Sequence, residues 1–379
     1  MKYVYACACS VGILLATAHR LPAASVYAQT NLASDVPGLA AFTDPNIVNP
    51  WGIANSATSP FWLSDQGSGL STLYIGNGMP QALVVTVPPT GIPSGPTGIV
   101  FNSSPTGFVL GDGSSATFIF DTLAGTIDGW NGGEGTTAAI QHTAPGAVYT
   151  GLAQSGSTLY AANFTVGGTI DVYNSSFSPT TLPGNFVDPT LPSGYAPYNI
   201  ALINGDLYVE YAVVNPTNGM PIKSVGLGIV AEFDTNGNYI RTLVNGGAGS
   251  LLDAPWGITQ APATGFGSFS GDILIGNFGN GEINVYDPAT GNLLGTLSNS
   301  SGNPIVNANL WALEFRTGGT DVNPDALYFD AGIDNQTEGL FGDITVVPEP
   351  GSFGLILIGC AFIGLWAVSR RLVKPGSRS

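Results

Sequence analysis

The chain has 379 residues, of which only 9% are charged, and its 25 Asp and Glu against 9 Lys and Arg give a net charge of −16. So acidic a chain cannot bind nucleic acid through the phosphates, and we exclude a nucleic-acid partner. Its three cysteines, Cys7, Cys9 and Cys360, lie in apolar segments near the two ends. We therefore expect neither a disulfide nor a thiolate nucleophile in the body of the chain.

Residues 1–28 have the pattern of a secretory leader. Lys2 precedes an apolar run, and Val26-Tyr27-Ala28 places small residues at the positions that a signal peptidase reads. Cleavage after Ala18 is the alternative. Either position predicts that the body, residues 29–347, is exported.

Residues 29–33 form a short segment that is compatible with a strand but has no neighbouring partner. One interpretation is a linker that follows the leader. The other, which we prefer, is a strand that completes the last unit of the repeat described next and so removes a free sheet edge.

A four-residue phrase recurs along the body at intervals of 46 to 58 residues. We call the second residue of each copy the marker. The copies are Pro50-Trp51-Gly52-Ile53, Pro96-Thr97-Gly98-Ile99, Tyr149-Thr150-Gly151-Leu152, Pro197-Tyr198-Asn199-Ile200, Pro255-Trp256-Gly257-Ile258 and Leu310-Trp311-Ala312-Leu313. A period of this length in units of short strands is typical of a β-propeller.

An apolar burst follows each marker and ends in an acidic or amide residue. The six terminal residues are Asp65, Asp121, Asn163, Glu210, Asn277 and Asp330. A glycine-rich loop and a third strand come next, and hairpin turns such as residues 234–238 lead to a fourth. We therefore predict an all-β fold, a six-bladed β-propeller over residues 29–347 whose ring is closed by the N-terminal strand in the last blade.

The longest insertion in the repeat, residues 211–225, falls in the fourth unit. A loop of this length in a compact ring is either a functional cover or a tolerated excursion. The sequence leaves both open.

Residues 348–379 differ abruptly in composition from the body. Pro348-Glu349-Pro350 comes first, then an uncharged run of 16 residues from Phe353 to Val368, and then Arg370 and Arg371. The run predicts a hydrophobic helix that reaches across a membrane if flanking residues help, with the basic end in the cytoplasm. A permanent anchor and a sorting tail both fit this pattern.

The Pro-Glu-Pro motif, apolar helix and Arg-rich end resemble the PEP-CTERM sorting signal of Gram-negative bacteria. The resemblance implies recognition by an exosortase-type enzyme, transient anchoring in the inner membrane, and a final place in the outer envelope or outside the cell. The body, in phrases such as residues 31–35, 48–54 and 309–313, resembles a family of secreted, uncharacterised bacterial proteins, and more distantly the NHL-type repeat propellers. This resemblance implies a fold and a location but no reaction.

The six residues that end the bursts are candidate metal ligands. If the units are equivalent, the side chains of Asp65, Asp121, Asn163, Glu210, Asn277 and Asp330 recur at one level around the axis, and their oxygens would suit Ca²⁺, the only cofactor that the sequence suggests. Lactonase-type propellers hold a metal in a comparable axial position, which is an analogy. The alternative is that Asp and Asn end these strands in local turns.

The aromatic markers Trp51, Tyr198, Trp256 and Trp311 are candidate ligand-binding residues. Aromatic faces around a channel mouth would stack on sugars. The alternative is that they wedge between blades.

Histidine chemistry is not expected, because His142 is the only histidine of the body and no nucleophile elbow accompanies it. The catalytic residues are therefore unknown. Our first hypothesis is a non-enzymatic propeller of the cell envelope or extracellular matrix that binds a polysaccharide or a protein partner. The second is a Ca²⁺-dependent hydrolase or lyase of the lactonase-like type, with Asp65, Asp121 or Asp330 as the base.

Overall fold

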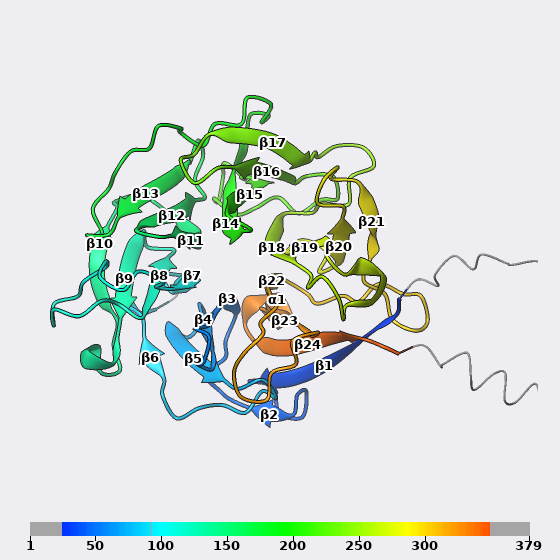
Figure 1. Ribbon diagram of the computed structural model, residues 1–379, viewed down its shortest axis with the longest axis horizontal. Helices are drawn as coiled ribbons and strands as arrows, with labels where there is room; N and C mark the ends of the chain where they lie inside the picture. Colours follow the sequence, from blue (N-terminus) through cyan, green and yellow to red (C-terminus); the bar gives the residue numbers. More distant parts are fainter. Residues whose placement is uncertain (1–24, 92, 349–379) are drawn as a thin grey trace, which may run out of the picture.

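The computed structural model describes residues 25–91 and 93–348, which form six β-sheets arranged in a ring around a central axis (Figure 1). The predicted all-β, six-bladed propeller is confirmed. Each repeated phrase lies at or near the start of the innermost strand of one sheet. These strands are β3 (Pro50–Ala54), β7 (Pro96–Phe101), β11 (Tyr149–Ser155), β14 (Tyr195–Ile203), β18 (Pro255–Gln260) and β22 (Leu310–Glu314).

The apolar bursts form the second strand of every sheet, as predicted, and they pair antiparallel with the innermost strands. They are β4 (Phe61–Asp65), β8 (Phe118–Thr122), β12 (Thr158–Asn163), β15 (Asp206–Val213), β19 (Ile273–Asn277) and β23 (Leu327–Ala331). The third strands are β5 (Leu70–Tyr74), β9 (Thr126–Trp130), β13 (Ile170–Asn174), β16 (Ile229–Phe233), β20 (Ile283–Tyr286) and β24 (Leu340–Val346).

In four of the sheets the chain continues from the third strand into a fourth: β6 (Val85–Thr86), β10 (Ala139–Thr143), β17 (Tyr239–Val244) and β21 (Leu293–Thr296). The third blade ends at β13, so the prediction of four strands in every unit is wrong there. The chain between β13 and β14 contains Pro179, Pro183, Pro189 and Pro192. Because proline has no N–H to donate to a strand ladder, this segment does not extend the sheet.

The sixth sheet also contains the start of the described chain. β1 (Tyr27–Ser34) pairs antiparallel with β24, with Tyr27 opposite Val346, and β2 (Phe42–Thr43) pairs parallel with β1. Tyr27 is buried and its hydroxyl donates to the carbonyl oxygen of Phe266 at 3.0 Å. Of the two predicted cleavage positions, the one after Ala28 therefore falls inside β1, and the one after Ala18 lies upstream of it.

Three short helical turns complete the fold: the 3₁₀ turns η1 (Gly132–Glu134) and η2 (Gly267–Phe269), and α1 (Ile333–Gln336) between β23 and β24. Over residues 25–91 and 93–348, no helix is long and apolar enough to cross a bilayer. Most of the predicted leader, the predicted C-terminal hydrophobic helix, and Glu349, Pro350, Arg370 and Arg371 of the predicted sorting tail lie outside the described residues.

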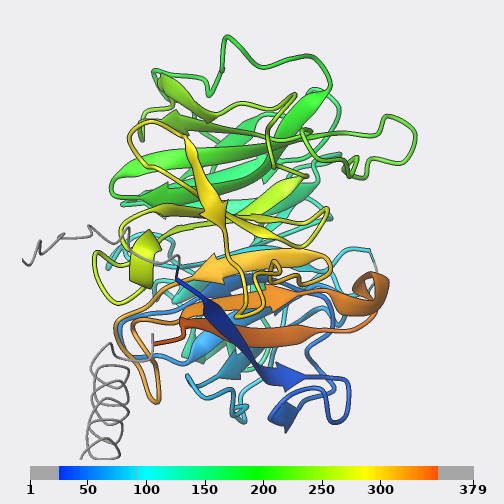
Figure 2. The same cartoon turned by 90° about the vertical axis from the view of Figure 1, so that its right-hand side faces the viewer.

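The two faces of the ring carry different parts of the chain. We call the face at which the innermost strands begin the upper face, and the opposite one the lower face. The upper face is on the right in Figure 2, where the green loop after β15 and the orange turn α1 both project from it. Both ends of the described chain leave from the lower face, where Tyr27 pairs with Val346.

The long insertion begins three residues later than predicted, because β15 continues to Val213. Residues 214–228 then connect β15 to β16. The first part is a small hairpin, which we call the upper hairpin (residues 214–221), closed by a bridge between Val214 and Pro221.

Large apolar side chains pack between neighbouring blades. Trp62 of β4, for example, stacks on Phe118 of β8 with ring centroids 4.2 Å apart. Such contacts between successive units hold the ring together, because each blade by itself is a small sheet that cannot bury both of its faces.

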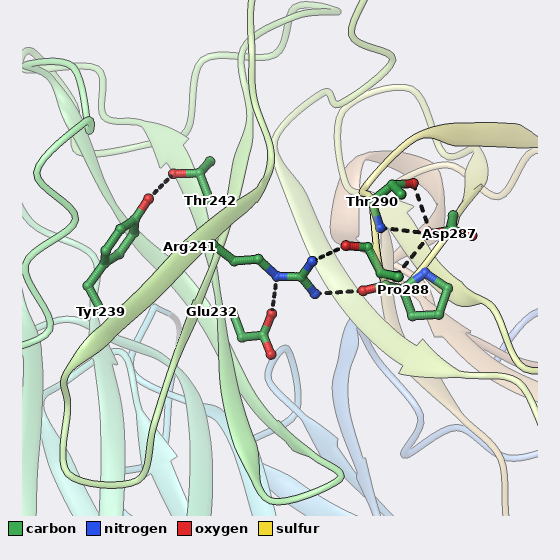
Figure 3. Close-up of polar contacts among 8 residues, drawn as sticks. Glu232, Tyr239, Arg241, Thr242, Asp287, Pro288 and Thr290 are labelled. Carbon is green, nitrogen blue, oxygen red and sulfur yellow. Dashed lines mark hydrogen bonds and ion pairs between the residues drawn. The ribbon is translucent and has the colours of Figure 1, made fainter.

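A polar contact joins blades four and five at the outer rim. Arg241 on β17 binds Glu232 on β16 through Nε at 2.6 Å, and its two terminal nitrogens donate to the carbonyl oxygens of Pro288 and Ala289 in the β20–β21 turn (Figure 3). Asp287 stabilises that turn by accepting from Thr290. The pair of Arg241 and Glu232 is the only ion pair among the described residues.

We expect Arg241→Met to lower the free energy of unfolding by roughly 1–3 kcal/mol, because hydrogen bonds to a charged group are lost and Glu232, which is buried, is left without its partner. Urea denaturation measures the change. The double variant Glu232→Gln/Arg241→Met should recover part of the loss, since it leaves no unpaired charge. A single variant as stable as the parent would contradict this role.

Candidate functional site

Every innermost strand has a bulge at its marker. The register against the second strand shifts between Pro255 and Gly257, for example, and at the matching point of the other five sheets. In four of the six copies the residue after the marker is a glycine. A Cβ on Gly257 would lie 2.2 Å from the carbonyl oxygen of Trp311 on the next blade. The repeated glycine is thus explained by the close approach of neighbouring strands near the axis.

Two of the acidic residues near the ends of the second strands bind the backbone at these bulges. Asp121 Oδ1 accepts from the Gly98 N–H at 2.6 Å and from Thr97 Oγ1 at 2.8 Å, and Asp330 Oδ1 accepts from the Ala312 N–H at 2.7 Å. Burial raises the pKa of Asp121 to about 7 and that of Asp330 well above its ordinary value. These carboxyls therefore hold the innermost strands in place.

The other four predicted metal ligands also bind within their own blades. Asp65 accepts from the N–H and hydroxyl of Thr72, and Glu210 accepts from Asn199 Nδ2 at 3.0 Å. Asn163 accepts from the Val148 N–H and Asn277 from the Asp253 N–H, in the loops that lead into β11 and β18.

These contacts do not form a shared metal centre. Within the described part of the chain, no three His, Cys, Asp or Glu side chains gather so that they could hold a metal ion. The structure therefore does not bring Asp65, Asp121, Glu210 and Asp330 together, and the residues present do not fit the calcium site that the sequence suggested. Burial also raises the pKa values of Asp65 and Glu210, which favours neutral carboxyls rather than hard anionic ligands.

The four aromatic markers meet at the axis. Trp51 stacks on Trp311 with ring centroids 3.5 Å apart, and Trp256 meets Trp311 edge-on at 5.6 Å. Tyr198 lies 6.0 Å from Trp311, and Phe278 stacks on the same ring at 4.3 Å. We call these five residues the aromatic plug. All are buried, so their faces mainly contact one another.

Hydrogen bonds fix two of the plug's indoles. Trp311 Nε1 donates to Asn49 Oδ1 at 3.1 Å, and Trp256 Nε1 donates to the carbonyl oxygen of Thr150 at 2.7 Å. The Nε1–H of Trp51 is buried and has no acceptor among the described residues.

A cavity lies above the plug, and one of the two small markers lines it. Thr97 and Thr150 stand where the other blades place aromatic rings, and Thr150 lines a cavity of about 630 Å³ on the upper face. Trp51, Tyr198 and Trp311 form its floor. The walls are mainly apolar: Pro93, Leu123, Val148, Phe164, Val166, Met220 and Pro221.

Amides and threonines supply the polar part of the wall. They are Asn49, Gln66, Asn218, Asn335, Gln336, Thr165 and Thr337. None of the lining residues is Asp, Glu, His, Lys or Arg. The cavity is therefore suited to a neutral, largely apolar group, and it contains no acid or base for catalysis other than the phenol of Tyr198, whose pKa burial raises further.

The mouth of the cavity carries exposed apolar side chains. Val166 in the β12–β13 turn is 70% exposed, and Met220 of the upper hairpin is 48% exposed. Opposite them, Asp334, Asn335 and Gln336 all have positive φ angles, of 47°, 54° and 68°. Three successive left-handed residues are unfavourable without glycine, so the rest of the blade must hold this turn in place.

A second hollow of about 390 Å³ lies on the other side of the plug. It is the central channel, lined by the innermost strands of all six blades and by Trp256. Glu314 lines it, accepts from Asn55 Nδ2 at 3.1 Å, and has its pKa raised by burial to about 7. The channel and the upper cavity share no lining residue, and the plug lies between them.

Most cavity residues were not predicted from the sequence. Trp51, Tyr198 and Trp311 were, and they reappear as its floor, whereas Trp256 faces the channel. The available signal was the pair of small markers, Thr97 and Thr150, which leaves the ring of aromatics incomplete on one side. His142 lies on β10, packed against Tyr173 at 4.9 Å and outside the cavity lining.

Comparison with known proteins gives relatives in a virus. No protein-family model matches the chain. Uncharacterized protein R648 of Acanthamoeba polyphaga mimivirus is 31% identical over 330 residues, which cover 83% of this chain and 78% of that protein. Uncharacterized protein L690 of the same virus is 30% identical over 321 residues, which cover 81% and 82%.

Solved structures with the same fold are more distant. A Bacteroides thetaiotaomicron protein of unknown function has 12% identity and a TM-score of 0.52, over 85% of this chain and 76% of that one. A streptogramin B lyase has 12% identity and a TM-score of 0.50, over 85% and 97%. The soluble aldose sugar dehydrogenase of Escherichia coli has 11% and 0.50, over 84% and 99%. At these identities the likeness shows the propeller fold alone.

Both mimivirus relatives are viral proteins, whereas the sequence resemblance pointed to a bacterial family. The comparisons do not show the PEP-CTERM signal. The bacterial origin, the sorting tail and the exosortase partner therefore stay predictions.

Proposed function

Because this chain belongs to the same family as the mimivirus proteins R648 and L690, which are described only as uncharacterized, we propose its function from its own geometry: it binds a neutral ligand in the upper cavity and does not transform it. The observation that carries the proposal is the cavity lining, which combines an aromatic floor and apolar walls with no ionised side chain. In this proposal the propeller is exported and acts in the cell envelope or extracellular matrix, as its leader and tail predict.

Of the two ligand classes predicted from the sequence, a protein partner fits this lining better than a polysaccharide. A sugar ring would place hydroxyls against Leu123, Val148, Val166 and Met220, which offer them no hydrogen bond. An apolar side chain of a protein has no hydrogen bonds to give up when it leaves water and enters the cavity. Exposed apolar residues around a concave site are also typical of protein interfaces.

The catalytic alternative has less support. A Ca²⁺-dependent hydrolase or lyase needs several hard oxygen ligands at one point and a base beside the substrate. The four carboxylates proposed for that role lie in separate blades, and none of them lines the cavity. The streptogramin B lyase and the aldose sugar dehydrogenase share only the fold with this chain, so they do not support a catalytic function here.

The proposal is tested with the neutral fluorescent probe N-phenyl-1-naphthylamine. We expect one molecule to bind per chain with a rise in fluorescence, and the anionic probe 1-anilinonaphthalene-8-sulfonate to bind more weakly because the protein is strongly acidic. Met220→Asp should weaken neutral-probe binding about tenfold or more. A probe that covers this half-exposed position would have to remove water from a carboxylate, which costs at least the roughly 1.4 kcal/mol that corresponds to a factor of ten.

Met79→Asp is the matched control, because Met79 is 43% exposed in the β5–β6 turn and does not line the cavity. This variant should bind the probe as the parent does. Absence of binding in the parent protein, or equal weakening in both variants, would refute the proposal.

A further inference from the structure

The upper cavity is closed at its base. The aromatic plug blocks the axis beneath it, so whatever occupies the cavity enters and leaves through the mouth between Val166, Met220 and the 334–336 turn. A polymer cannot thread through the ring at this point. A single bulky side chain that projects from a partner's surface fits this shape.

Three carboxylates lie together beside the cavity wall. Asp334 and Glu338 flank the lining residues Asn335, Gln336 and Thr337 in sequence, and Asp35 accepts from the Gly339 N–H at 2.8 Å. Burial raises the pKa of Glu338, and the neighbouring negative charges of Asp334 and Asp35 raise it further. We call Asp35, Asp334 and Glu338 the acidic trio.

No cation of the described chain neutralises the acidic trio, because its one ion pair joins Arg241 to Glu232 on another part of the ring. The cation on the upper hairpin's connection, Lys223, is occupied elsewhere. Its Nζ donates to Asn309 Oδ1 at 2.6 Å and lies 3.8 Å from the centre of the Phe278 ring. The negative potential beside the cavity is therefore available to a partner.

The left-handed turn at residues 334–336 connects the upper cavity with the acidic trio. Its residues Asn335 and Gln336 face the cavity, and its first residue, Asp334, belongs to the acidic trio. Backbone strain in an otherwise regular blade is concentrated where the apolar cavity and the charges adjoin.

We propose that the partner is a protein segment in which a large apolar side chain neighbours a lysine or arginine. The apolar side chain fills the blind cavity on the aromatic plug, and the cation pairs with the acidic trio. This inference rests on the proposed binding function and adds the chemistry of the partner.

Three capped peptides test it by displacing N-phenyl-1-naphthylamine from the full-length protein: acetyl-Gly-Lys-Phe-Lys-Gly-amide, its Glu-Phe-Glu counterpart, and its Lys-Ser-Lys counterpart. At low salt we expect the Lys-Phe-Lys peptide to displace the probe at about one tenth of the concentration that the other two need, and this advantage over Glu-Phe-Glu to shrink in 0.5 M NaCl.

In the variant Asp334→Asn/Glu338→Gln, the Lys-Phe-Lys peptide should displace the probe no better than the Glu-Phe-Glu peptide does. Binding of the probe itself should be unchanged. Asn tolerates the left-handed region as well as Asp does, so the turn persists. Glu134→Gln/Asp325→Asn is the matched control, because it makes the same charge change at two residues outside the cavity lining and the trio, and it should keep the advantage.

Equal displacement by the Lys-Phe-Lys and Glu-Phe-Glu peptides would overturn this inference while the binding function stood. Displacement by Lys-Ser-Lys as effective as by Lys-Phe-Lys would also overturn it, since charge alone would then suffice. If the probe itself did not bind, the proposed function would fail first, and the two failures are thereby distinguished.

Discussion

Raising the pH from 5 to 8 should lower the free energy of unfolding by several kcal/mol. Asp121 alone should contribute about 3 kcal/mol, because its pKa in the fold is about 7 against an ordinary 3.8, about two units of that interval lie above pH 5, and each unit corresponds to about 1.4 kcal/mol. The folded protein keeps a proton that the unfolded chain has already lost. This stabilisation is therefore complete below the ordinary pKa and disappears as the pH rises through about 7.

The other buried carboxyls act in the same direction. Burial raises the pKa values of Asp65, Glu210, Asp330 and Glu314 as well. Urea denaturation at pH 5, 6, 7 and 8 measures the combined slope. A protein equally stable at all four values would show that these groups are ionised in the fold.

Asp121→Asn isolates the contribution of one group. Its amide oxygen can still accept from the Gly98 N–H and Thr97, so the variant resembles the protonated acid. It should match the parent only at or below about pH 4, the ordinary pKa, and its advantage should grow by about 3 kcal/mol between pH 5 and pH 8. An unchanged pH slope in this variant would contradict the assignment.

Trp311→Ala should lower the free energy of unfolding by about 3–5 kcal/mol, the range found when large buried aromatic side chains are truncated. Trp311 is completely buried, and four other rings of the aromatic plug contact it, with Trp51 at 3.5 Å and Phe278 at 4.3 Å. The change also leaves Asn49 Oδ1 without its indole donor. Urea denaturation at a single pH, with circular dichroism to confirm the β-sheet content, measures the loss.

Phe101→Ala serves as the comparison, because Phe101 is an aromatic residue on an innermost strand that remains partly exposed. It should cost less than about 1 kcal/mol, as surface changes usually do. If the two variants lost equal stability, the plug would not be the centre of the fold.

The fold could be predicted because its physical causes recur in the sequence. Gly52, Gly98, Gly151 and Gly257 mark the close approach of neighbouring innermost strands, so the repeat could be counted from the residues that this approach requires. The missing fourth strand of blade three was also visible in principle, since four prolines interrupt the segment after β13. The end of β15 was not, because Tyr211, Ala212 and Val213 are compatible with either a strand or a loop.

The candidate site was only half predictable. The markers were expected to point to the axis, and they do, but whether four aromatic rings would surround an opening or fill it depends on their rotamers and on Phe278, which lies outside the repeated phrase. The acidic residues recur as regularly as a metal site would require. These residues instead satisfy donors in their own blades. Asp121 and Asp330 accept from N–H groups at the bulges, and the other four accept from a neighbouring strand, side chain or loop.

The position of β24 has a mechanical consequence. This strand lies between β23 and β1 and is hydrogen-bonded to both. A pulling force applied to the chain beyond Val346 would act on a strand held by two ladders, whereas the outermost strands of the other blades are held by one. The chain beyond Val346 leaves from the lower face. A protein held by that end would therefore present its upper cavity on the side away from the point of attachment.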